Sequence, residues 1–85
     1  MATKTKKAQK PTKSELVTAA KKSRAVISEW VKTSRIKADM SQDALASFAG
    51  VDRKTVNRIE NGHFSPNLDT MTRLSLVLGK KIPQL

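Results

Sequence analysis

Apolar side chains recur at helical spacing in two short runs between Met40 and Gly62, and a three-residue break separates the two runs. The first run places three apolar side chains on one face of a predicted helix: Leu45, Phe48 and Ala49. Ser41 offers a hydroxyl that can cap the start of this helix, and Gly50 suits the left-handed conformation in which helices often end. The pattern therefore predicts a capped helix followed by a tight turn.

A second predicted helix follows Val51, which we expect to fill the angle between the two helices. Asp52 stands where it can cap this helix, and Val56 with Ile59 forms its apolar side. The remaining surface carries cationic and amide side chains: Arg53, Lys54, Asn57, Arg58 and Asn61. Such donors match guanine, phosphate and adenine. A charged helix face is often merely solvated, but the preceding helix and turn give the outline of a helix-turn-helix, so we predict entry into the major groove of DNA.

The same stretch resembles the Cro and repressor type of helix-turn-helix, also called the XRE family. The resemblance runs from about Ile27 to Gly79, and it rests on the joint register of Arg35, Ser41-Gln42, Leu45-Ala46, Gly50-Val51, Val56, Ile59-Glu60-Asn61-Gly62, Pro66, Leu68 and Leu78-Gly79. It implies a transcriptional regulator that binds double-stranded DNA.

The resemblance also implies roles for single side chains. Gln42 would contact a phosphate or support the recognition side chains, and Asn61 would bind backbone phosphate. Base edges or the nearby backbone would be contacted by Arg53, Lys54, Thr55 and Arg58, with Asn57 between them on the same helix. Arg35 and Glu60 would form a structural ion pair below that helix. A helical wheel agrees, since it puts each of the two at the edge of a buried face.

Helical patterns also flank the central motif. Thr12 and Glu15 have the spacing of a capping box and introduce a stripe of small and apolar side chains that reaches Ala38. Whether residues 12–38 form one helix or two is left open by the sequence. Asn67 is placed to cap a last helix that ends at Gly79, whose apolar stripe contains Leu68, Met71, Leu74 and Leu78. Phe64 is expected to anchor the loop before it in the core.

These elements predict an all-α fold, a small helical bundle of four to five helices with a flexible basic N-terminal arm. We divide the chain into an arm over residues 1–11, a helical extension over 12–26, the helix-turn-helix domain over 27–79, and a short tail over 80–85. With 85 residues, the chain has room for one domain and little room for an enclosed active site. It also lacks a nucleophile with a base, so we expect no enzyme.

Charge strengthens the prediction of a polyanionic partner. The chain carries a formal net charge of +10, of which residues 1–24 hold eight basic side chains and one acidic one. The arm contributes four of these, Lys4, Lys6, Lys7 and Lys10, which we expect to lie on the DNA backbone, although a solubilising tail has the same composition. No cysteine and a single histidine give no basis for a disulfide or zinc site, and we expect no cofactor. With no cysteine, no export signal and no apolar run that could span a membrane, we expect a cytoplasmic protein.

The prediction is a sequence-specific regulator, a repressor that binds a palindromic operator as a homodimer. Apolar residues off the stripe of the last helix and in the tail are candidates for the dimer contact: Leu76, Val77, Ile82 and Leu85. One alternative is the antitoxin of a toxin–antitoxin pair, which would bind both its operator and a toxin. Another is a coactivator that bridges proteins.

Overall fold

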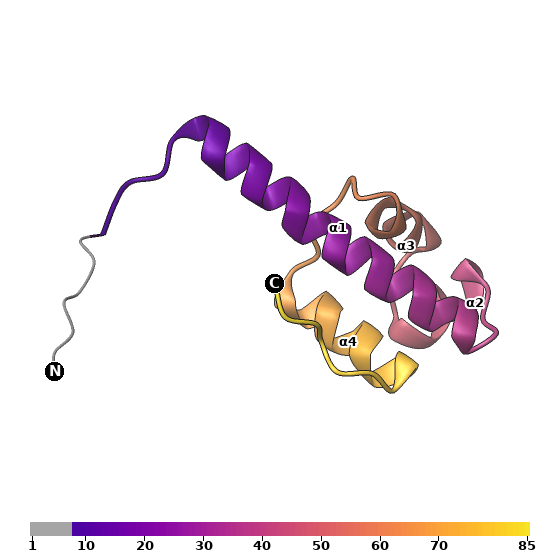
Figure 1. Ribbon diagram of the computed structural model, residues 1–85. Helices are drawn as coiled ribbons and strands as arrows, with labels where there is room; N and C mark the ends of the chain where they lie inside the picture. The colour runs from indigo at the N-terminus through magenta and orange to yellow at the C-terminus, as the bar shows by residue number, and fades with distance from the viewer. Residues whose placement is uncertain (1–7) are drawn as a thin grey trace, which may run out of the picture.

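The structure is a computed structural model that describes residues 8–85, and within this range the chain is all-helical with four helices (Figure 1). They are α1 (Lys13–Lys37), α2 (Gln42–Ala49), α3 (Arg53–Glu60) and α4 (Leu68–Leu78). Helix α3 packs against α1 and α2, while α4 packs against α2 and α1. The predicted all-α bundle is confirmed. No helix of residues 8–85 is both long and apolar enough to cross a membrane.

Helix α1 is a single helix of 25 residues, which answers the question that its sequence left open. Its capping box is complete: the Glu15 backbone N–H donates to the Thr12 hydroxyl at 3.0 Å, and the Thr12 backbone N–H donates to the Glu15 carboxylate at 2.8 Å. The boundary drawn between residues 26 and 27 falls inside this helix. Asp39 reverses the chain after it with a φ of 58°, a conformation that aspartate tolerates better than most residues.

Helices α2 and α3, the two motif helices, begin and end largely as expected. Ser41 caps α2 by accepting the backbone N–H of Ala44 at 3.0 Å, and Gly50 ends that helix in the left-handed conformation with a φ of 73°. Asp52 holds the cap position of α3, but its side chain makes no capping hydrogen bond. The first turn of α3 therefore presents backbone N–H groups without a side-chain cap.

The core lies where the four helices meet. Its largest fully buried side chains are Val31, Leu45, Val56, Ile59 and Leu74. Three residues assigned to buried faces are instead exposed: Phe48 by 74%, Leu68 by 71% and Phe64 by 36%. The buried residues of α2 are Leu45, Ala46 and Ala49. Phe48 therefore lies outside the buried face of this helix. Val77, expected off the stripe of α4, packs partly against the core.

Two glycines with positive φ provide a matched test of this packing. A Cβ at Gly50 would lie 3.0 Å from Nη1 of Arg73, whereas one at Gly79, with a φ of 66°, would have no neighbour within 4 Å. We expect Gly79→Ala to lower the free energy of unfolding by about 1 kcal/mol, the cost of a left-handed alanine. Gly50→Ala should cost about 1 kcal/mol more, because the guanidinium must leave its bond to the Ala49 carbonyl. Urea unfolding of both variants measures the difference, and equal losses would contradict it.

Candidate nucleic-acid interface

The outward surface of α3 is the candidate interface. Val56 and Ile59 are almost fully buried, with exposed fractions of 0% and 1%, so the orientation of the helix is fixed by its apolar side. Arg53, Lys54, Asn57 and Arg58 are exposed on the remaining surface, Thr55 is half-buried, and Asn61 is exposed just after the last turn. The one carboxylate of α3, Glu60, is buried. The surface of α3 that faces solvent is therefore cationic and rich in amides.

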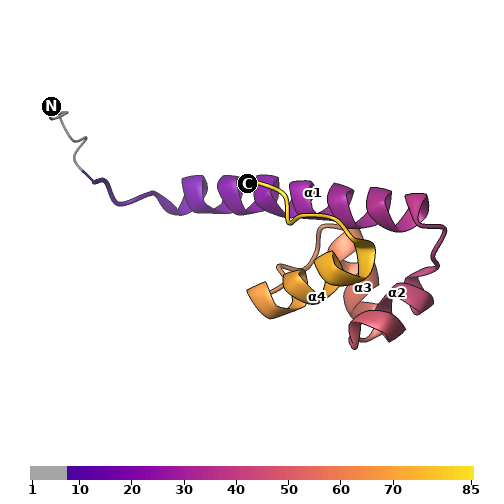
Figure 2. The same ribbon diagram turned by 90° about the horizontal axis from the view of Figure 1, so that it is seen from below.

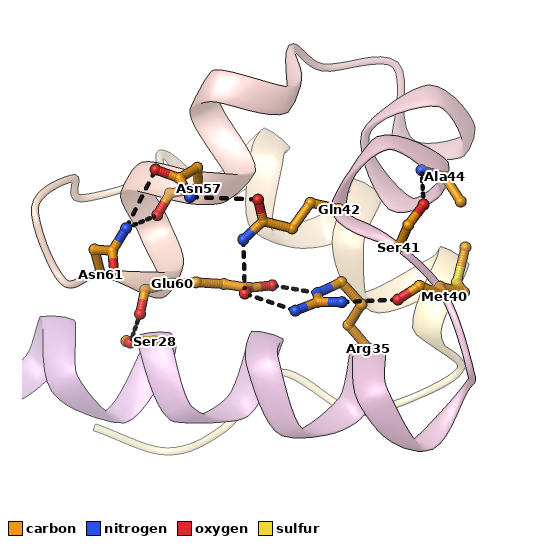
Figure 3. A network of polar contacts seen from close by, with 9 residues as sticks. All are labelled: Ser28, Arg35, Met40, Ser41, Gln42, Ala44, Asn57, Glu60 and Asn61. Atoms are coloured by element: carbon orange, nitrogen blue, oxygen red, sulfur yellow. Dashed lines mark hydrogen bonds and ion pairs between the residues drawn. The ribbon is translucent and has the colours of Figure 1, made fainter.

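Glu60 joins three helices through its side chain and backbone (Figure 3). Its carboxylate accepts hydrogen bonds from Arg35 of α1, with Nε at 2.6 Å from Oε2 and Nη2 at 3.0 Å from Oε1. The same Oε1 accepts the Gln42 amide of α2 at 3.0 Å. The Glu60 backbone carbonyl accepts the hydroxyl of Ser28 on α1. Helix α3 is thus tied to both neighbours at one residue.

The Arg35–Glu60 ion pair is largely removed from water, with side-chain exposures of 14% and 4%. Arg35 also donates through Nη1 to the Met40 carbonyl at 2.8 Å, which holds the turn between α1 and α2. The hydrogen bonds to Glu60 raise the pKa of Arg35 above its ordinary value, and partial burial opposes this effect. The guanidinium therefore keeps its charge at any pH at which the fold would be studied.

The side-chain amides of Gln42, Asn57 and Asn61 form a chain of hydrogen bonds that runs from Glu60 to the surface, and we call this chain the amide relay. A carboxylate only accepts hydrogen bonds, so the NH₂ of Gln42 must face Glu60 and its oxygen must face outward. That oxygen accepts Nδ2 of Asn57 at 3.3 Å, and Oδ1 of Asn57 accepts Nδ2 of Asn61 at 3.2 Å. Each amide in the relay thereby takes a defined orientation. One N–H of Gln42 and one N–H of Asn57 remain for an external acceptor.

The amide relay includes both side chains for which a phosphate contact is expected, Gln42 and Asn61. The side-chain oxygen of Gln42 is bonded to Asn57, so Gln42 orients a side chain of the candidate interface. The side-chain amide of Asn61 donates to both the backbone carbonyl and the side-chain oxygen of Asn57, at 2.9 and 3.2 Å. A side-chain donation from Asn61 to phosphate would have to break one of these bonds. Neither bond follows from the sequence, because both depend on which rotamers the packed helices allow.

Arg53 has a partner, Asp43, that the sequence patterns do not predict. Its Nε lies 3.3 Å from Oδ1 of Asp43 in the first turn of α2, and both side chains are mostly exposed, by 60% and 79%. Ion pairs of this kind are weak because water screens them. Arg53 can therefore leave Asp43 for a nucleic-acid acceptor at small cost. The spacing of Asp43 and Arg53, one in the first turn of each motif helix, is the signal that would have suggested the pair.

Other expected contacts fall partly outside the described residues. Lys10 is exposed ahead of α1, whereas Lys4, Lys6 and Lys7 lie outside the range that the structure describes. Within residues 8–85 no group of three or more His, Cys, Asp or Glu side chains is arranged to hold a metal ion.

Two comparisons with known proteins bear on this surface. Residues 31–85 match the family described as Helix-turn-helix (HTH_3). A protein of Haemophilus influenzae, named an uncharacterized HTH-type transcriptional regulator, is 38% identical to this chain over 58 residues. That match covers 68% of this chain and 58% of the relative, so the chain spans little more than half of the relative's length.

Replacing Glu60 with glutamine tests its structural role. Glu60→Gln keeps the shape but removes the charge that pairs with Arg35, leaving a nearly buried guanidinium without its counter-ion. We expect unfolding free energy to fall by about 3 kcal/mol, the lower end of the range for broken buried pairs. Asp43→Asn is the matched control, since it removes the carboxylate of the exposed pair and should cost less than about 1 kcal/mol. Thermal unfolding measures the loss of stability in both variants. Similar losses would show that the buried pair stabilises the fold no more than the exposed pair does.

Proposed function

This chain belongs to the Cro/C1-type (XRE) helix-turn-helix family, and we propose that it is a sequence-specific DNA-binding transcriptional regulator. The name of the Haemophilus influenzae relative supports the same class of function. In this proposal α3 lies in the major groove and the start of α2 lies at the DNA backbone.

One observation carries the proposal: α3 buries its apolar side completely and turns a cationic, amide-rich side to solvent beside Gln42. Arg53 and Arg58 are the side chains suited to paired hydrogen bonds with guanine. Asn57, oriented by Gln42, presents one N–H outward, and Lys54 supplies a charge for phosphate or guanine. Glu60 lies on the buried side of α3, so no carboxylate of this helix faces the nucleic acid.

We further propose that the protein is a repressor that occupies a near-palindromic operator as a homodimer. A helix of eight residues contacts only a few base pairs, which is too little for useful affinity and specificity from one copy. Two copies related by a two-fold axis would place their α3 helices in successive major grooves, about 34 Å apart.

The base-reading role predicts how specificity changes. Arg53→Ala and Arg58→Ala should each relax preference at particular base pairs, by a discrimination of about 1–3 kcal/mol, while the melting temperature stays near that of the parent. Selection of bound sequences from a random pool measures this. Lys37→Ala is the control, because it removes one charge at the end of α1 and should leave base preference unchanged. Identical preferences in all variants would contradict the assigned reading surface.

The basic arm should contribute affinity without sequence information. Deleting residues 1–11 removes four lysines and leaves the Thr12 cap in place, so α1 should still form. Each phosphate that the arm no longer neutralises lowers the slope of log affinity against log salt by about 0.9, so the slope should fall by up to about four per chain. Titrations of operator and unrelated DNA at several salt concentrations measure this. An unchanged slope would show a solubilising tail, and a loss on operator DNA alone would show base reading by the arm.

A further inference from the structure

The N-terminal part of α1 projects beyond the other three helices (Figure 2). Its first buried residue is Ile27, although the helix begins at Lys13. The apolar stripe nevertheless continues toward the N-terminus, because Leu16 and Ala20 lie within about 20° of Ile27 around the helix axis. Leu16 is 56% exposed and Ala20 is also exposed. The apolar stripe of α1 thus continues N-terminal to Ile27, beyond the part of the helix that packs against the core.

An open apolar groove lies beside this projection. It has a volume of about 300 Å³ and is bordered by α1, the first half of α4 and the C-terminal tail. Its apolar walls include Ile27, Leu68, Met71, Ile82 and Leu85. Arg24 is the charged residue of its lining, and the Nε of this residue donates to the Gly62 carbonyl at 3.1 Å. The groove is therefore apolar, and it is large enough for a leucine side chain from another molecule.

We propose that a second copy of this chain fills the groove, with the α1 helices of the two protomers crossing antiparallel at Ala20 and each Leu16 entering the partner's groove. This proposal rests on the homodimer proposed above and assigns its interface. It moves the contact from the outer side of α4, where Leu76 lies, to the projecting half of α1 and the tail.

Self-complementarity favours a second copy over an unrelated protein. A two-fold contact requires a projection and a matching recess on the same surface of one molecule. Leu16 is the projection, and the groove beside Ser23 and Ile27 is the recess on the same stripe of the same helix. Ala20 lies between them, and its small side chain allows two helices to approach closely. A two-fold axis at Ala20 brings each Leu16 to the partner's groove at once.

The same axis places both α3 helices where one DNA duplex needs them. Helix α3 is bound to α1 at Ser28 and Arg35, which lie about 80–100° around the helix from Ile27. A two-fold axis between antiparallel helices keeps such side elements on one side of the dimer. Both bonds end on Glu60, the last residue of α3, and the midpoint of Ser28 and Arg35 is about 17 Å along α1 from Ala20. The two Glu60 residues, at the C-terminal ends of the α3 helices, would therefore lie about 34 Å apart along that direction. This separation matches one turn of DNA.

Charge sets the conditions under which the dimer forms. Each protomer carries a net charge of +10, and the projecting half of α1 includes Lys13, Lys21 and Lys22, so two copies repel each other at low ionic strength. The contact itself is apolar, and salt screens this repulsion. Raising the salt concentration should therefore strengthen self-association while it weakens DNA binding. These opposite trends separate the dimer contact from the DNA contact.

Sedimentation of the full chain without DNA tests the interface. Leu16→Lys puts a charge into the apolar groove, and because Leu16 is exposed in the single protomer, the fold should be unchanged by circular dichroism. We expect its dimer dissociation constant to rise at least tenfold. Leu76→Lys is the matched control: it adds the same charge at a leucine that is 78% exposed on α4 outside the groove, and it should dimerise like the parent.

A cysteine variant gives an independent readout, since the chain has no cysteine of its own. Ala20→Cys should form a disulfide-linked dimer on mild oxidation, because the crossing brings the two Cα atoms within the 7 Å or so that a disulfide requires. Thr18→Cys, on the opposite side of the same helix, should not.

Three outcomes would overturn the proposed interface: a monomeric parent, a Leu16→Lys variant that dimerises normally, or dissociation of the Leu76→Lys control. A monomeric parent would leave the groove open to a different protein, such as the toxin of the antitoxin alternative. DNA binding by that monomer would leave the regulator proposal intact. A dimer that selects no DNA sequence would instead remove the proposed function and leave the interface.

Discussion

The carboxylate of Glu60 is the group on which the arrangement around α3 depends. It receives the guanidinium of α1 and the first side-chain amide of α2, while the backbone carbonyl of the same residue receives a hydroxyl from α1. A buried carboxylate without these donors would be strongly unfavourable, so the three helices are held in the one arrangement that satisfies it. Gln42 must turn its NH₂ group toward the Glu60 carboxylate, so its oxygen faces Asn57 at the surface and accepts a hydrogen bond from it. The contacts that fix the packing of α3 therefore also orient the side chain of Asn57.

Signals confined to neighbouring residues gave the most reliable predictions. The caps at Thr12, Ser41 and Asn67 depend on a side chain and a backbone N–H three positions apart, so they can be predicted from the local sequence. The same local signal at Asp52 is not followed by a capping hydrogen bond. Gly50 and Gly79 end their helices because a left-handed residue costs glycine least. The Arg35–Glu60 pair spans 25 positions, so family resemblance and a helical wheel predict it and local chemistry does not.

Predictions failed where the answer depended on distant neighbours. Phe48, Phe64 and Leu68 are apolar and follow helical or loop patterns, which predict burial, yet all three are exposed. The width of a buried face is set by the elements that cover it. Helix α2 has only eight residues, and its smaller Ala46 occupies the covered side in place of Phe48. The hydrogen bonds of the amide relay also cannot be predicted from the sequence, since spacing along the chain does not show which side-chain rotamers meet across two helices.

The continuity of α1 has a consequence for how such a chain can change in length. The residues from the Thr12 cap to Arg35 belong to one rigid rod, so a single inserted residue would rotate everything on one side of it by about 100° and lift it by about 1.5 Å. Between Leu16 and Ile27 such an insertion would turn the projecting stripe away from the line of the core. Insertions of seven residues would nearly restore the angle, turning the stripe by only about 20° while adding about 10 Å. Changes in the length of this helix that keep the stripe in line are therefore expected to add close to a whole number of turns, such as seven or eleven residues.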